Sequence, residues 1–185
     1  MVALLVVITF VQANAYPGNN VFRHAYSDRI VTLDPAATHT HMDWEIILQV
    51  YEPLVQYSNG SLTDLQPILT TTIPTIANGL ITDDGLTYTF PIRKGVKFHN
   101  GSELTAEDVA YTFNRIIEMN IPESKARQYL SPYIERAEAT DKYTAKIILK
   151  DVYPGLLFAL ADASACIVNK EYVESHGGVE AGQEN

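Results

Sequence analysis

The clearest grouping of metal-ligating side chains is the short run HTHMD at residues 39–43. His39, His41 and Asp43 occupy alternate positions in it. Imidazole and carboxylate groups ligate transition metals, and residues two apart face one side of an extended strand. A metal site is therefore one interpretation of this run. The other is a polar loop that leads into a helix, in which Asp43 already serves in capping.

The chain has one cysteine, Cys166, within the apolar run ASACIV. Cys166 and His176 could act as a nucleophile and its base, but apolar surroundings raise the pKa of a thiol and leave little thiolate. We therefore expect Cys166 to be a small buried hydrophobic residue. The sequence also has no G-x-S-x-G nucleophile elbow, P-loop or Rossmann fingerprint. These observations predict a protein that is not an enzyme and uses no cofactor.

Two asparagines stand in N-glycosylation acceptor sequences. Asn59 and Asn100 are each followed by glycine and then serine, which is the acceptor pattern of a secreted protein. Asn-Gly is also ordinary hairpin-turn chemistry. The two interpretations are compatible with each other.

A helix is predicted to begin within the HTHMD run. Thr40, with Asp43 three residues later, fits a capping box. Apolar residues then recur at helical spacing, namely Trp44, Ile47, Leu48 and Tyr51. Pro53 ends the helix, because the residue before a proline avoids helical geometry.

The stretch GLTYTFPIRKGVKFHNGSELTAEDVAYTF, residues 85–113, predicts a strand, a turn and a second helix. Alternate apolar residues of the strand share one face. Pro91 cannot donate to a ladder, so either the strand lies at a sheet edge or its Pro91 amide side is unpaired. Thr105 caps the helix, with Glu107 and Asp108 in its first turn. Further strands are predicted at 21–35 and 164–168, and a hairpin around residues 141–142. This order of elements indicates an α+β or mixed α/β fold.

The composition is that of a globular protein. The chain has 185 residues, 46% hydrophobic and 19% charged, with a net charge of −9. This length is enough for one domain with its own core. The negative charge argues against non-specific binding to nucleic acid, whose phosphates need a basic surface.

The N-terminus has the pattern of a secretory signal peptide. An uninterrupted apolar run at residues 2–11 is followed by Ala13 and Ala15 in a small-x-small arrangement. Residues 1–15 are therefore predicted to be a signal peptide, with the mature chain starting near Tyr16. No Lys or Arg precedes the run, so its basic region is incomplete. A buried N-terminal strand is the alternative.

The segment DDGLTYTFPIRKGVKFHNGSELTAEDVAYTFNRI resembles the hallmark segment of the family 5 solute-binding proteins of ABC importers. That segment has an Asp-Gly turn, an aromatic strand, a short basic strand, a glycine turn and a helix opening Thr-Ala-x-Asp-Val. Upstream, the Leu-Asp-Pro at residues 33–35 and the Tyr-Glu-Pro-Leu at 51–54 resemble the family's opening. Downstream, residues 144–174 resemble the segment that completes an inserted subdomain. The resemblance covers about residues 21–178.

The resemblance implies part of a type II periplasmic-binding-protein clamp. Residues 16–60 would begin its first lobe and 61–178 would form a subdomain inserted in that lobe. Residues 179–185 would be a truncated end, and the second lobe would be missing. The expected fold is thus one wall of an interlobe cleft.

The implied function is to bind a dipeptide or oligopeptide outside the cytoplasm and deliver it to an ABC permease. The protein would be secreted, periplasmic or on the outer face of the membrane, and monomeric. In the family, the loop after Leu-Asp-Pro lines the cleft. That places Thr38, Thr40, His41, Met42 and Trp44 in the ligand-binding wall, although Trp44 could equally belong to a helix core.

Three other interpretations stay open. Within the family, the solute could be nickel, a metal chelate or an oligosaccharide, although ADASACIVNK lacks the arginine of nickel-binding relatives. In another class, the chain could be a secreted hydrolase that depends on a metal at His41 or on Cys166. It could also be a structural or sensory module that reuses the scaffold.

Overall fold

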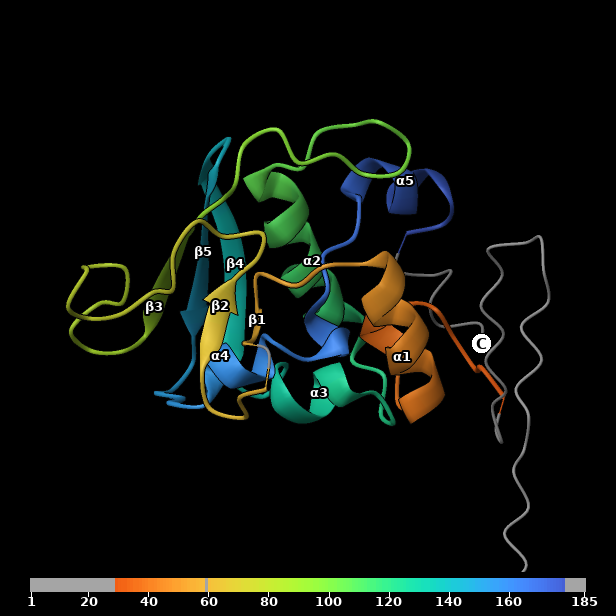
Figure 1. Cartoon of the computed structure of the whole chain (residues 1–185), viewed down its shortest axis with the longest axis horizontal. Coiled ribbons are helices and arrows are strands. Elements are labelled where there is room, and N and C mark those ends of the chain that lie inside the picture. Colours follow the sequence, from red (N-terminus) through yellow and green to blue (C-terminus); the bar gives the residue numbers. More distant parts are fainter. Residues whose placement is uncertain (1–28, 59, 179–185) are drawn as a thin grey trace, which may run out of the picture.

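The computed structural model describes residues 29–58 and 60–178. Its centre is a three-stranded antiparallel sheet in the order β3-β5-β4, covered on one face by the long helix α2 (Figure 1). The bounds are β3 Thr87–Pro91, β4 Ile134–Asp141, β5 Thr144–Leu149 and α2 Ala106–Met119.

The remaining elements are short and surround this centre (Figure 1). Strands β1 and β2 form a separate antiparallel hairpin, as the Asn-Gly turn predicts. The bounds are η1 Pro35–Ala37, α1 His41–Val50, β1 Val55–Tyr57, β2 Leu65–Pro67, α3 Lys125–Tyr129, α4 Leu156–Ala159, η2 Ala163–Ala165 and α5 Lys170–Ser175. The predicted mixed α/β class is confirmed.

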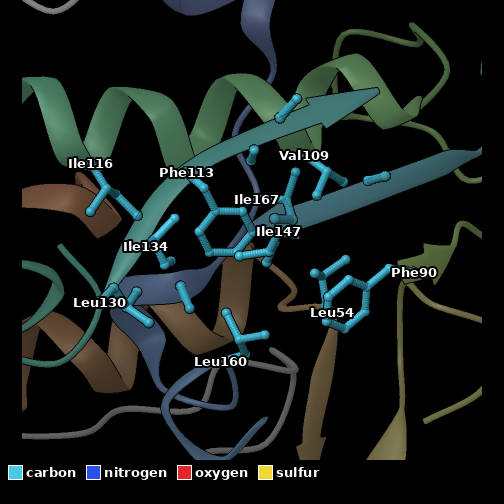
Figure 2. Packing of buried hydrophobic residues seen from close by; sticks show 14 of the residues in the cluster. Leu54, Phe90, Val109, Phe113, Ile116, Leu130, Ile134, Ile147, Leu160 and Ile167 are labelled. Carbon is cyan, nitrogen blue, oxygen red and sulfur yellow. The ribbon is translucent and has the colours of Figure 1, made fainter. Parts of the chain in front are cut away.

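The core forms where the sheet meets α2. Apolar residues at alternate positions of β3 and β5 turn inward, as a period of two requires. Figure 2 shows the ring of Phe113, from α2, close to Ile134 of β4 and Ile147 of β5, and all three are fully buried. Burying a side chain of this size contributes on the order of 2 kcal/mol. The sheet and α2 therefore form one unit.

Helix α2 begins where the sequence predicts. The backbone N–H and the hydroxyl of Thr105 both donate to a carboxylate oxygen of Asp108, at 2.9 Å. The helix ends at Met119 because Asn120 adopts a left-handed conformation with φ 43°.

The predicted edge position of β3 is also confirmed. Pro91 lies in an outer strand, where a missing N–H costs no ladder bond. The chain covers that edge with its own preceding loop: the N–H of Thr89 donates to the carbonyl of Leu80 at 2.7 Å, and that of Thr71 to Pro91 at 2.8 Å. The hairpin around residues 141–142 is present as β4 and β5.

Two strand predictions are wrong in the part of the chain that the structure describes. Residues 29–34 form no strand, because the N–H groups of Val31 and Thr32 donate to the carboxylate of Asp43 instead of to a ladder. Residues 163–165 form η2, and the extended segment after it bonds to two unrelated elements. Ile167 donates to the carbonyl of Glu52, and Val168 to the hydroxyl of Thr112. Residues 21–28 lie outside the described part.

Glu103 ties the basic loop after β3 to the β4–β5 turn. Its carboxylate accepts from Lys142 Nζ at 2.9 Å, from the hydroxyl of Tyr143 at 2.9 Å and from the N–H of Gly95 at 3.2 Å. The ammonium groups of Lys94 and Lys142 also lie over the Tyr143 ring. The hydrogen bonds from Lys142, Tyr143 and Gly95, in that order, lower the pKa of Glu103 to about 2.

This lowered pKa makes a prediction about acid stability. A carboxylate with a pKa of about 2 when folded and about 4.5 when unfolded stabilises the fold above pH 4.5 and loses that effect as the pH falls toward 2. Glu103→Gln should therefore be less stable than the wild type at pH 7. The difference should shrink as the pH falls from 4.5 to 2, measured by urea unfolding at each pH. Stability curves that stay parallel across this range would contradict the prediction.

Candidate functional site

A groove with a volume of about 950 Å³ lies between α1 and α5. Both helices lie on the same side of the molecule (Figure 1). Most of its lining residues come from residues 33–35, the C-terminal end of α1, the loop at 96–100 and the segment 167–178 that contains α5. The lining includes Leu33, Asp34, Leu48, Tyr51, Phe98, Arg115, Ile167 and Tyr172.

An ion pair between the buried guanidinium of Arg115 and the partly exposed carboxylate of Asp34 joins one wall of this groove to α2. Arg115 Nη1 and Nη2 donate to the two carboxylate oxygens of Asp34, at 2.9 Å and 2.5 Å. The Arg115 side chain is only 4% exposed. Asp34 also accepts from the N–H of Ala36 at 3.0 Å and so begins η1. A two-pronged contact of this kind fixes orientation as well as distance.

The ion pair also affects the pKa values of Arg115 and Tyr51. Burial by itself would lower the pKa of Arg115, but the hydrogen bonds and the charge of Asp34 outweigh it, so the pKa lies above its ordinary value. Burial, helped by the charge of Asp34, raises the pKa of the Tyr51 phenol. Tyr51 therefore keeps its proton beside the pair at neutral pH.

The five residues predicted for the cleft wall lie together at the corner between η1 and α1. Thr38 is fully buried, Thr40 is the N-cap of α1, and His41 is exposed. Met42 and Trp44 are half-buried. None of the five lines the groove, so this corner and the groove are separate surfaces.

The corner contains two buried polar atoms that have no hydrogen-bond partner among the described residues. They are the hydroxyl of Thr38 and the indole N–H of Trp44. The Trp44 ring receives the edge of His41, at 4.9 Å between centroids. A buried polar group without a partner costs about 1–3 kcal/mol.

The HTHMD run does not converge on a common point. Asp43 is fully buried, and one of its carboxylate oxygens accepts from the N–H groups of Val31 and Thr32. Burial raises the pKa of Asp43, but these hydrogen bonds and that of Thr40 outweigh it and lower the pKa. Residues 29–58 and 60–178 contain no group of three His, Cys, Asp or Glu side chains placed to hold a metal ion. Asp43 organises the loop instead, as the capping interpretation predicts.

Cys166 and His176 lie in opposite environments. Cys166 is fully buried and packs with Ile47 and Ala163. That burial, with smaller effects of nearby carboxylates, raises the pKa of its thiol to about 12. His176 is exposed, and its ring stacks on Tyr172 at 4.1 Å between centroids. The burial predicted for Cys166 is confirmed.

Of the two glycosylation sequences, the structure describes one. Asn100 is exposed in a turn, and its side-chain oxygen accepts from the N–H and the hydroxyl of Ser102. Asn59 lies outside the described residues, as do the predicted signal peptide at 1–15 and the end at 179–185. Glycosylation at either asparagine stays a prediction.

Sequence reasoning missed the Asp34–Arg115 pair. The partners are 81 residues apart, and neither belongs to a recognisable charge pattern. The available signal was weak: Arg115 falls on the buried side of an amphipathic helix, where an unpaired charge would be costly.

A comparison with known protein families identifies the class of protein, the bacterial extracellular solute-binding proteins. Residues 67–181 match the model of the bacterial extracellular solute-binding proteins, family 5 Middle. The match covers more than half of the chain. The chain therefore belongs to the family 5 solute-binding proteins, as its hallmark segment indicates.

Curated relatives agree with this assignment. Di/tripeptide-binding protein 3 of Pseudomonas aeruginosa (strain UCBPP-PA14) is 33% identical over 175 residues, which cover 82% of this chain and 31% of that protein. Heme-binding protein A of Haemophilus influenzae is 34% identical over 142 residues, covering 69% of this chain and 25% of that protein. The chain thus spans about a third or less of the length of these relatives.

Solved structures share the fold. The periplasmic binding protein DppA of Helicobacter pylori, in complex with the peptide STSA, has a TM-score of 0.63 and 28% identity. That similarity covers 77% of this chain and 30% of DppA, which is consistent with a partial lobe. OppA of Listeria monocytogenes, bound to peptide, has a TM-score of 0.70 at 19% identity and shows the fold alone.

Within the described residues, no helix has the length and apolar character to cross a membrane.

The environment of Cys166 predicts that its thiol is inert. With a pKa of about 12, about one thiol in ten thousand is ionised at pH 8. Iodoacetamide should therefore leave the native thiol unmodified over hours and label it rapidly after unfolding in urea, as measured by mass spectrometry. Rapid labelling of the folded chain would contradict this and would reopen the hydrolase interpretation.

Proposed function

We propose that this chain is part of the extracytoplasmic substrate-binding component of an ABC importer. It binds a dipeptide or oligopeptide and delivers it to a membrane permease. The observation that carries the proposal is the family match at residues 67–181, together with 33% identity to a protein named as di/tripeptide-binding. The solute, the permease and the delivery step belong to the proposal.

The corner between η1 and α1 is the proposed ligand-facing wall. It presents the exposed imidazole of His41 against the half-buried ring of Trp44. The hydroxyl of Thr38 and the indole N–H of Trp44 are buried beneath this surface and have no hydrogen-bond partner among the described residues. Thr40 and Met42 complete the wall.

The proposed organisation follows from the same family. Residues 16–60 begin the first lobe, and residues 61–178 form the inserted subdomain. A second lobe closes on the solute, so residues 16–178 supply one wall of the cleft. The protein acts as a monomer, in the periplasm or on the outer face of the membrane, after removal of residues 1–15. It neither catalyses a reaction nor binds nucleic acid.

The test is peptide binding by the secreted product, including any polypeptide that follows residue 185 in its reading frame. Di- and tripeptides should bind with micromolar or tighter affinity in isothermal titration calorimetry. His41→Ala should weaken this binding about tenfold by removing one contact of the wall. Arg136→Ala, an exposed position on β4, is the matched control and should bind as the wild type does.

Other ligands decide between this proposal and its alternatives. Heme, a nickel chelate and an oligosaccharide should show no binding under the same conditions. Binding of one of these ligands in place of peptides would contradict the proposed solute but not the proposed role in an importer. If neither peptides nor these ligands bind, and the protein shows hydrolytic turnover that His41→Ala or Cys166→Ala abolishes, the proposed function itself is contradicted.

A further inference from the structure

Among the described residues, the side chain of Asn114 bonds to outward-facing backbone groups in the middle of the outer edge of β4, and its helix α2 packs against the same strand. Strand β4 is one of the two outer strands of the sheet, and an outer strand presents N–H and C=O groups that can pair with another chain. Ala137, in the middle of β4, lies opposite Ile147 of β5. Its backbone N–H donates to Asn114 Oδ1 at 2.8 Å, and its carbonyl accepts from Asn114 Nδ2 at 2.9 Å.

The Asn114 carboxamide acts here as the partner strand would. Its carbonyl oxygen and the N–H on the same side of the amide plane point in the same direction, so it satisfies both backbone groups of Ala137 at once, as the N–H and C=O of one residue in a partner strand would. The other outer strand, β3, is covered by a loop of backbone through Leu80 and Thr71. At the outer edge of β4, the side chain of Asn114 on α2 takes the place of such a loop.

The part of β4 around Ala137 is suited to pair with a second copy of itself. Between the two irregularities at residues 134–136 and 139–141, the strand is regular. An antiparallel pair centred on Ala137 would place Arg136 opposite Glu138 of the second copy, and the reverse. Both side chains are accessible at the surface, at 52% and 44%. Opposite charges directly across a strand pair favour pairing.

We propose that Asn114 closes the outer edge of β4 and thereby prevents two copies of this chain from pairing edge to edge through residues 136–138. The partner excluded is a second copy of this chain. In an antiparallel pair centred on Ala137, Arg136 of each copy lies opposite Glu138 of the other. This inference rests on the sheet and α2 alone and is independent of the solute.

Removal of the carboxamide tests the proposal in the intact chain. Asn114→Ala should self-associate at least about tenfold more tightly than the wild type in sedimentation equilibrium, because two edge hydrogen bonds become available. The Ala137 amide should exchange rapidly with deuterium at low concentration and become protected as the concentration rises. Glu118→Ala, an exposed position one turn further along α2, is the control and should behave as the wild type does.

A second substitution keeps the test specific to this edge. Adding Glu138→Arg to Asn114→Ala would place like charges opposite each other, so association should fall back to the wild-type level. Asn114→Asp, which can accept from Ala137 but cannot donate to it, should give an intermediate result. A folded Asn114→Ala variant whose sedimentation and Ala137 exchange do not change with concentration would overturn the proposal.

Discussion

The ion pair between Arg115 and Asp34 is the contact on which the position of the N-terminal segment depends. A guanidinium that is 4% exposed would be strongly destabilising without its carboxylate, because a buried charge loses its hydration. Asp34 meets this need and at the same time begins η1. The proposed cleft wall follows η1 directly, so its place relative to α2 and the sheet is set by this pair. Asp43 then fixes the chain before η1 by accepting from Val31 and Thr32.

What the sequence predicts well is local. The caps at Thr40 and Thr105, the edge position of Pro91 and the β4–β5 hairpin depend on residues within a few positions of one another, and the structure has them all. The contacts that sequence reasoning missed join distant segments. Arg115 is 81 residues from Asp34, and Asn114 is 23 from Ala137. No periodicity encodes such pairs.

The difference between local and long-range contacts also explains the strands and sites that the sequence predicts wrongly or only in part. Apolar residues at 164–168 predict a strand, but the N–H groups of Ile167 and Val168 reach a carbonyl at Glu52, in the loop after α1, and a hydroxyl at Thr112 of α2. The HTHMD run has the right residue types for a metal, yet tertiary contacts take the Asp43 carboxylate. The cleft-wall residues were assigned by resemblance to a family. The structure gathers them at one corner, and their role there remains our proposal.

A double-mutant cycle on Asp34 and Arg115 tests the central claim most directly. The free energy of unfolding would be measured for Asp34→Asn, Arg115→Met and the double variant. We predict that each single change costs about 3–5 kcal/mol and that the double change costs at least about 2 kcal/mol less than their sum. In the single variants, the amides of residues 36–38 should also exchange faster. Strictly additive costs, with unchanged exchange at η1, would show that the segment is held by other contacts.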